Sequence, residues 1–489
     1  MGNVKKETIQ GAKWQMLQKI TLQPVLLLLS MLLARLITPA EFGILGLTNV
    51  FFTIAATLAS SGLGSALIRE IHRTDTDINT VFWTNLLFSA IASGILALCA
   101  PLFVLFFKQP ALRLLTYAGA GIMFLNSVSA IHNILFICDR NFKTPAIVSI
   151  IVCLLTLPPT IAVAYMGWGY WAIMFQNALS ALINMIIMWH LSPWKPRFIW
   201  SSDSFHRLFG YGCKLAITGV IESSFSNLKS LLIGKFYQPA QLGLFDRAWK
   251  LANLPSSSIN GMLQTVTFPI LASIQEDENR LLKVYSMYVR ITSLGIFFCS
   301  CLMVAIAEPL VRLMYGEQWL SCVPYLQIVL WGTMCFHFGT INVNLLLVKG
   351  RSDLVLRISI IKKLISVVLI VPAVYFSMNA VCWASVAFIP FSLLINSYYT
   401  SRLLNYSLVN QLKDFMPYLV LSALVCIPAY FATLLPIPDF YRILIGSCFS
   451  LICYVCILKS FKDSAYYELL QIIEEKGITA KFPFFKYLR

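Results

Sequence analysis

Charged side chains are scarce in this sequence. Of its 489 residues only 12% are Asp, Glu, Lys or Arg, about half the ~25% usual in a soluble domain, whereas 58% are hydrophobic. A soluble domain of this size needs a charged exterior that the composition cannot supply. The composition therefore excludes soluble globular, disordered and fibrous proteins, and it predicts a surface that faces lipid over most of its area.

The signatures of several chemistries are also missing. There is no Gly-x-x-x-x-Gly-Lys-Ser/Thr sequence for an ATP site, and the five histidines lack metal-ligand spacing. Asp75-Thr76-Asp77 has the shape of a glycosyltransferase metal motif, but no nucleotide-binding domain surrounds it. We interpret it as a helix-capping turn. The sequence thus predicts no enzyme, no metal and no cofactor.

The 13 cysteines are equally uninformative about chemistry. Nearly all of them lie inside apolar segments, where cysteine acts as a small buried side chain. The sequence therefore predicts no disulfide framework. No connection is long enough for a soluble domain, and the absence of a large exported loop disfavours a membrane polymerase or ligase.

Long apolar runs are what the sequence does contain. A bilayer core of ~30 Å requires about 20 mostly apolar helical residues, and the alternation typical of a membrane β-barrel is absent. We therefore predict an all-α integral membrane protein with fourteen transmembrane helices. They cover residues 14–35, 43–66, 80–107, 112–137, 145–166, 170–191, 211–234, 251–274, 285–307, 321–348, 357–377, 379–400, 415–435 and 441–458.

Basic residues set the predicted orientation. The net charge is +16, and most of the 37 Lys and Arg residues lie in short loops that are cytoplasmic if the N-terminus is cytoplasmic. This asymmetry is typical of membrane proteins and indicates neither a nucleic-acid partner nor an exported N-terminus. We expect both termini in the cytoplasm.

An internal repeat predicts two halves. The segment Arg35-Leu-Ile-Thr-Pro-Ala-Glu-Phe-Gly43 resembles Lys235-Phe-Tyr-Gln-Pro-Ala-Gln-Leu-Gly243, with the basic residue, Pro-Ala and Gly in register. We predict two six-helix lobes, residues 1–200 and 201–405, related by a pseudo-twofold axis along the membrane normal. Two further helices at 406–460 and a cytoplasmic tail at 461–489 follow.

Polar side chains within the spans are the candidate site. Such groups are costly in hydrocarbon, so they indicate function or interhelical pairing. The first and seventh spans each carry a polar stripe, which we expect to line a central cavity, with Glu222 as a possible ion-coupling residue. The predicted cavity residues are Gln15, Gln18, Lys19, Gln23, Glu222, Ser226, Lys229, Asn253, Asn260 and Gln264. Weaker candidates are Asn85, Asn126, Asn133, Gln176, Asn177, Asn342 and Asn344.

Simpler roles for the same residues stay open. Lys19 and Lys229 lie near the ends of their spans and can extend to the membrane surface. Glu222 can form a structural pair with Lys229. The polar residues of the eighth span can serve as interhelical hydrogen bonds.

One family resemblance rests on short motifs. Leu36-Ile-Thr-Pro-Ala-Glu-Phe-Gly43 is similar to a loop of polysaccharide exporters in the multidrug/oligosaccharidyl-lipid/polysaccharide superfamily, and Ala66-Leu-Ile-Arg69 and Thr80-Val-Phe-Trp-Thr-Asn85 resemble further segments. The likeness is to the Wzx-type branch with colanic-acid and teichuronic-acid exporters. In related lipid flippases, cations of the first, second and eighth spans line the cavity, and here Lys19 matches the first-span position.

The resemblance implies a function. Members flip undecaprenyl-diphosphate-linked oligosaccharides outward by alternating access, for capsule, exopolysaccharide or O-antigen export. It implies a monomer in the bacterial cytoplasmic membrane, with membrane lipids and the polymerase or glycosyltransferases of the pathway as partners. The alternative is a multidrug/cation antiporter of the same superfamily. A twelve-span facilitator is disfavoured, because its Gly-x-x-x-Asp-Arg loop is missing from residues 67–79.

Overall fold

The chain is described here from a computed structural model over residues 2–60, 62–404 and 406–475, without the side chains of residues 2–10, 12, 258–269 and 472–475. Every regular element in these ranges is a helix, which confirms the all-α prediction. The chain divides into two compact units, Met1–Gly243 and Leu244–Arg489.

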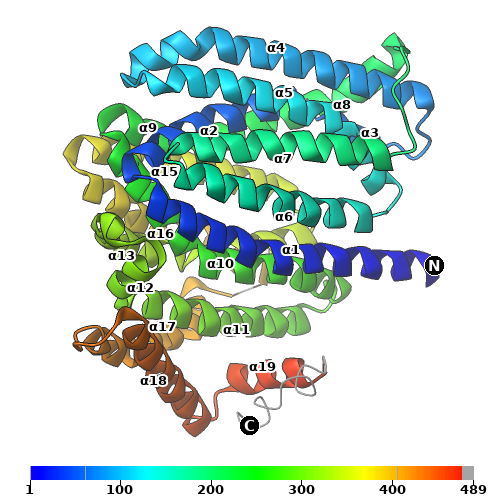
Figure 1. The fold of residues 1–489 in the computed structure, drawn as a ribbon. Coiled ribbons are helices and arrows are strands. Elements are labelled where there is room, and N and C mark those ends of the chain that lie inside the picture. The colour runs from blue at the N-terminus through cyan, green and yellow to red at the C-terminus, as the bar shows by residue number, and fades with distance from the viewer. Residues whose placement is uncertain (1, 61, 405, 476–489) are drawn as a thin grey trace. The chain divides into compact units, whose positions relative to one another are not determined.

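The first unit is a bundle of long helices with two short ones. Figure 1 shows α4 and α5 running side by side, with α7, α6 and α1 in neighbouring positions. The helices are α1 (Gly2–Leu36), α2 (Pro39–Ala59), α3 (Leu63–Arg69), α4 (Asp75–Phe107), α5 (Ala111–Cys138), α6 (Lys143–Tyr165), α7 (Tyr170–Leu191), α8 (Ser202–Ser226) and α9 (Leu228–Phe236).

Helix α2 is defined sharply at both ends. Thr38 and Glu41 form a capping box, in which the threonine hydroxyl accepts from the Glu41 amide and the carboxylate accepts from the Thr38 amide. The chain then leaves the helix before Gly62, which has φ +64°. A Cβ there would lie 2.2 Å from the carbonyl oxygen of Gly212 in α8. The turn between α2 and α3 therefore requires glycine, and the predicted span 43–66 is a helix followed by a break.

The two repeated loops pack against each other. A Cβ on Gly43 would lie 1.7 Å from the carbonyl oxygen of Pro239, and one on Gly243 would lie 2.0 Å from that of Pro39. Each glycine thus allows the backbone of the other loop to approach, and the contact is reciprocal. The repeat seen in the sequence is also a repeat in packing.

Helix α10 (Pro239–Ser273) leads into the second unit, which is built from nine further α-helices and one 3-10 helix in the described residues. These are α11 (Glu278–Ala305), α12 (Ala307–Tyr315), η1 (Glu317–Cys322), α13 (Val323–Thr333), α14 (Phe336–Val348), α15 (Ser352–Phe376), α16 (Met378–Leu404), α17 (Leu408–Ala432), α18 (Asp439–Ser460) and α19 (Ser464–Glu475).

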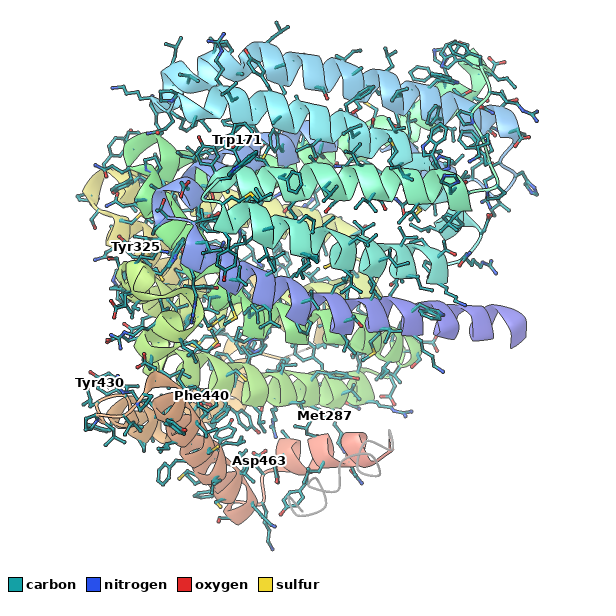
Figure 2. The ribbon with its side chains drawn as sticks, viewed as in Figure 1. Trp171, Met287, Tyr325, Tyr430, Phe440 and Asp463 are labelled. Atoms are coloured by element: carbon teal, nitrogen blue, oxygen red, sulfur yellow. The ribbon has the colours of Figure 1, made fainter. Side chains whose placement is uncertain are left out.

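Aromatic packing joins the helices of the second unit. The rings of Phe338 and Phe415 lie 4.2 Å apart and link α14 to α17. The Tyr454 hydroxyl donates to the carbonyl of Leu294, which links α18 to α11. Asp463, labelled in Figure 2 at the junction of α18 and α19, accepts from the Tyr418 hydroxyl at 2.8 Å. The helices that follow the predicted repeat therefore belong to the core of this unit.

Eleven helical segments of the described residues are long and apolar enough to cross a membrane, which supports a multi-pass membrane protein. Three of the fourteen predicted spans are not among them: 211–234, 251–274 and 357–377. The first is interrupted, because α8 ends at Ser226 and α9 begins at Leu228. The count of fourteen stays a prediction.

The compact units and the predicted lobes use different boundaries. Helix α8 packs on α2, and the hydroxyls of Thr57 and Ser223 lie 3.2 Å apart in that contact. The unit boundary accordingly follows Gly243, whereas the predicted lobe boundary at residues 200 and 201 rests on the repeat. The lobe division stays a prediction.

Candidate functional site

A cavity of about 830 Å³ lies inside the first unit. It is bounded by side chains from α1 to α7, so every helix of the first part of the unit contributes. Its volume is within the ~300–1,000 Å³ that is common for sites of small organic ligands. Helix α1 supplies Leu22 and Leu26 to the wall, and the break after α2 supplies Ser60 and Gly62.

The polar part of the lining consists of amides and hydroxyls. None of the lining residues is charged. The polar lining residues are Ser60, Ser65, Asn85, Ser89, Asn126, Ser127, Ser149, Thr156, Gln176, Asn177, Ser180 and Asn184. Between them lie apolar side chains such as Phe52 and Met123, so the wall is amphipathic.

Three of the amides are available to a ligand. The side chains of Asn126, Gln176 and Asn177 make no hydrogen bond within the part of the chain that the structure describes. Asn126 and Asn177 are exposed and Gln176 is half-buried. An amide offers two donors and one carbonyl acceptor, which matches a hydroxyl group that both donates and accepts.

The hydroxyl groups of the lining supply further hydrogen-bond acceptors, and one of them has no hydrogen-bond partner among the described residues. Ser149 and Thr156 donate to carbonyls of their own helix, which leaves their oxygen lone pairs for other donors. The Ser89 hydroxyl is buried and has no partner among the described residues. Because buried polar groups are nearly always hydrogen-bonded, Ser89 is a candidate partner for a polar group in the cavity.

The connection after α7 is fixed by polar contacts to the start of α4. The Arg197 amide donates to the Asn79 side chain at 2.7 Å, and the Ser201 amide donates to the Thr80 hydroxyl at 3.1 Å. The Trp83 indole donates to the carbonyl of Arg197 at 2.9 Å. This segment joins α7 to α8, and the contacts hold it against the bundle that contains the cavity.

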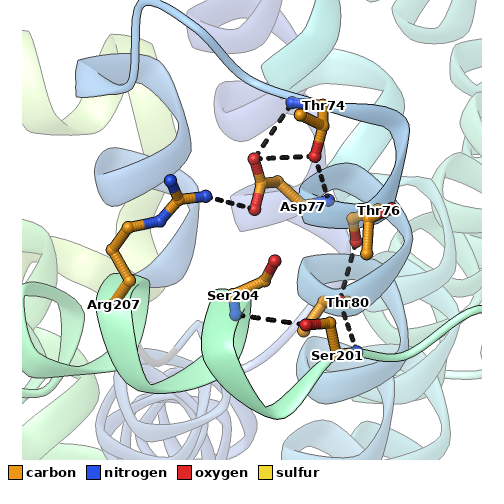
Figure 3. Close-up of polar contacts among 7 residues, drawn as sticks. All are labelled: Thr74, Thr76, Asp77, Thr80, Ser201, Ser204 and Arg207. Atoms are coloured by element: carbon orange, nitrogen blue, oxygen red, sulfur yellow. Dashed lines mark hydrogen bonds and ion pairs between the residues drawn. The ribbon is translucent and has the colours of Figure 1, made fainter.

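Asp77 is the centre of the next contact, shown in Figure 3. Its carboxylate accepts from the amide and hydroxyl of Thr74, each at 3.0 Å, and from the Arg207 guanidinium at 2.5 Å. The capping box confirms the helix-capping interpretation of Asp75-Thr76-Asp77. The Asp77 side chain is fully buried, whereas that of Arg207 is 52% exposed. The ion pair raises the pKa of Arg207 above its ordinary value.

The predicted stripe on α1 lies outside the cavity lining. Gln15, Lys19 and Gln23 are exposed and Gln18 is half-buried. Lys19 lies one turn before Leu22, so at ~100° per residue the two project from similar directions on the helix. The structure therefore places Lys19 next to the helix face that reaches the cavity.

The predicted residues from residue 222 onward are dispersed. Glu222 and Ser226 are exposed in the last turns of α8, and Lys229 is half-buried in α9 beyond the break. The Asn253 amide donates to the carbonyl of Trp249 in its own helix at 2.9 Å. The side chains of Asn260 and Gln264 lie outside the described residues. The role of this set stays a prediction.

The cavity includes residues that the sequence argument ranked low or missed. Asn85, Asn126, Gln176 and Asn177 were the weaker candidates, and Ser89, Ser180 and Asn184 were not proposed. The sequence of α7 does indicate this grouping, because residues 176, 180 and 184 are polar, are spaced four apart and therefore share one helix face. Asn85 and Ser89 have the same spacing in α4. The polar periodicity of the first and seventh predicted spans therefore also occurs in α4 and α7.

Comparisons with known proteins agree with this architecture. The family described as "Polysaccharide biosynthesis protein" matches residues 32–324. The teichuronic acid biosynthesis protein TuaB of Bacillus subtilis is 21% identical over 356 residues, which are 72% of this chain and 74% of TuaB. The succinoglycan biosynthesis transport protein ExoT of Rhizobium meliloti is 24% identical over 326 residues, 66% of this chain and 65% of ExoT.

A solved structure shows the same fold. The lipid II flippase MurJ in an inward closed conformation superposes with a TM-score of 0.73 at 13% identity. The superposition covers 93% of this chain and 99% of the MurJ chain. The likeness therefore extends over nearly the whole of both chains.

Proposed function

We propose a transport function on one premise: the chain belongs to the polysaccharide biosynthesis protein family. The protein flips undecaprenyl-diphosphate-linked oligosaccharide repeat units across the bacterial cytoplasmic membrane by alternating access. The flipped repeat units are used to build a surface polysaccharide such as capsule, exopolysaccharide or O-antigen. The names of TuaB and ExoT, which refer to polysaccharide biosynthesis and transport, and the fold shared with the flippase MurJ support this proposal.

The observation that carries the proposal is the uncharged, amide-lined cavity among membrane-spanning helices. A glycan cannot cross about 30 Å of hydrocarbon unaided, because its hydroxyl groups would lose their hydrogen bonds to water. Amides such as Asn126 and Gln176 replace that water. The polyprenyl chain needs no such replacement, because it stays dissolved in lipid.

The cavity also accounts for selectivity toward neutral polar groups. Organic cations bind most strongly to carboxylates, and the lining residues include none. Sugars instead require alternating donors and acceptors at short spacing. Gln176, Ser180 and Asn184 present such groups one helical turn apart along α7.

The remaining sequence predictions complete the proposal. Both termini lie in the cytoplasm, and two six-helix lobes alternate their access around the substrate, with Gln15, Lys19 and Glu222 among the groups it passes. Glu222 couples transport to an ion, because one charge crossing 100 mV supplies ~2.3 kcal/mol. The protein acts as a monomer in the pathway of its polymerase and glycosyltransferases.

The test is deletion of the gene in its host followed by complementation. The proposal predicts loss of a surface glycan and accumulation of the lipid-linked repeat unit on the cytoplasmic side. Wild-type chain should restore export. Drug hypersensitivity with normal surface glycan would instead support an antiporter and would contradict the proposal.

A further inference from the structure

Lys362 of α15 is a cation that the proposed function has not used. It packs in a group of three helices, because α15 lies against α14 and α16. At ~1.5 Å per residue, Gly339 is about 14 Å from the end of α14 at Val348, and Asn396 is about 12 Å from the end of α16 at Leu404. Both residues belong to candidate membrane spans. Lys362 lies beside them and is therefore at membrane depth.

Among the described residues, the groups around Lys362 give its ammonium no partner. Lys362 makes no hydrogen bond or ion pair with any residue that the structure describes. Asn396 is 1% exposed, and neither its Oδ1 nor its Nδ2 has a hydrogen-bond partner in the described ranges. A charge and a buried amide without partners are both costly in a membrane protein, so a ligand that satisfies them gains binding free energy.

Gly339 leaves room for one atom-sized group, such as a single oxygen, between these two side chains. A Cβ at Gly339 would lie 3.5 Å from Asn396 Nδ2 and 3.8 Å from Lys362 Nζ, and among the described side chains it would meet no other heavy atom within 4 Å. The two nitrogens therefore converge on the small volume next to the glycine. Both are donors, and the ammonium carries three N–H groups.

We propose that Lys362, Asn396 and Gly339 form an oxyanion site of the second unit that binds phosphate oxygens. Two converging donors of which one is cationic match an anionic oxygen, since charge-assisted hydrogen bonds are the strongest available to such donors. A lysine ammonium is a compact point charge that suits phosphate. The further step, that the phosphate is that of the lipid diphosphate substrate, rests on the proposed function. The carboxylate of an acidic sugar is the competing source.

The binding test uses the purified full-length chain in detergent and farnesyl diphosphate as the probe. Farnesol tests the tail alone, and glucuronate tests a carboxylate. We expect Lys362→Gln to weaken farnesyl diphosphate binding at least tenfold and to leave farnesol binding unchanged. Lys363→Gln is the matched control, because it removes a charge from the next residue of the same helix, and it should stay within twofold of wild type.

The Gly339→Ala variant tests whether a loss of binding reflects the site itself or a loss of folding. The added methyl group meets its neighbours only at ordinary contact distances, and alanine is the better helix former, so thermal stability should be kept. The methyl group nevertheless fills the space between the donors, and binding should fall as in Lys362→Gln. Lys362→Arg should retain part of the affinity. Wild-type binding by both Lys362→Gln and Gly339→Ala would overturn the site.

Two further results separate the site from the proposed function. Direct binding of glucuronate with no binding of farnesyl diphosphate would overturn the assignment to phosphate. If gene deletion leaves glycan export normal while Lys362→Gln loses the diphosphate, the oxyanion site stands and the proposed function fails. If export depends on the chain but Lys362→Gln exports and binds normally, the site fails alone.

Discussion

Single side chains decide what the cavity of the first unit can hold. Its lining offers amides and hydroxyls and no charge, and three of the amides are unpaired within the described residues. The same residue types serve elsewhere in the chain as packing, as Asn342 shows by accepting from the Tyr285 hydroxyl at 2.9 Å. What distinguishes a ligand-binding amide is therefore its missing partner and not its type.

Asn126→Leu tests the cavity at this scale. The change keeps the approximate size of the side chain and removes its donors and acceptor, so we expect glycan export to fall about tenfold or more, at normal protein level. The matched control is Asn133→Leu, which lies two turns further along α5 and does not line the cavity. Normal export by both variants would contradict the role of Asn126, and so would an equal loss of export in both.

Asp77 makes a second prediction, which concerns stability. Asp77→Ala removes the N3 member of the α4 capping box and its hydrogen bond from Arg207, and we expect a loss of about 2 kcal/mol in unfolding free energy. Arg207→Ala keeps the capping box and changes a half-exposed group, so its loss should be about 1 kcal/mol. Thermal unfolding in detergent ranks the two. A larger loss for Arg207→Ala would show that the capping box contributes little.

Some helix ends and helix contacts can be predicted from the sequence, and others cannot. The Pro-Ala-x-x-Gly loops are recognisable because their residues are fixed by a backbone contact, which Gly43 and Gly243 make reciprocally. The interruption between α8 and α9 cannot be recognised in the sequence, because Asn227 is a weak helix breaker inside an otherwise helical pattern. The break is instead stabilised locally, since the Asn227 side chain donates to the carbonyl of Ser223 at 2.8 Å.

The same reasoning explains why the residues that line the cavity differ from the predicted polar stripes. Periodicity shows which residues share a helix face, but it does not show whether that face meets lipid, another helix or a cavity. Gln15 and Gln176 look alike in the sequence, and only the packing of α5, α6 and α7 places Gln176 at the cavity. The residue types were predictable, and their grouping required the tertiary structure.

Glycine substitutions test the contact between the loops. Gly43→Ala and Gly243→Ala each insert a methyl group less than 2.1 Å from a proline carbonyl, so each should destabilise the protein, by about 1–3 kcal/mol. Gly121→Ala is the control, because its Cβ would meet nothing within 4 Å. It should be neutral or stabilising by about 0.5–1 kcal/mol. Equal melting temperatures of Gly43→Ala and Gly121→Ala in detergent would refute the tight contact.

At the scale of the whole molecule, composition predicted the class and the basic residues predicted the orientation. The structure supports many membrane-spanning helices, and the orientation stays a prediction. We expect a reporter active only outside the cytoplasm to be inactive when fused after Lys459 and active when inserted between Ser377 and Asn379. An active reporter after Lys459 would reverse the predicted topology.

The most direct measurement of the central claim is flipping by the purified chain in proteoliposomes. A fluorescent diphosphate-linked oligosaccharide is placed in one leaflet, and its appearance in the other is followed with a membrane-impermeant quencher. The account predicts movement that requires the protein, that is reduced at least tenfold by Asn126→Leu and that Asn133→Leu leaves unchanged. Movement equal to that in protein-free liposomes, under conditions in which the chain is folded, would contradict it.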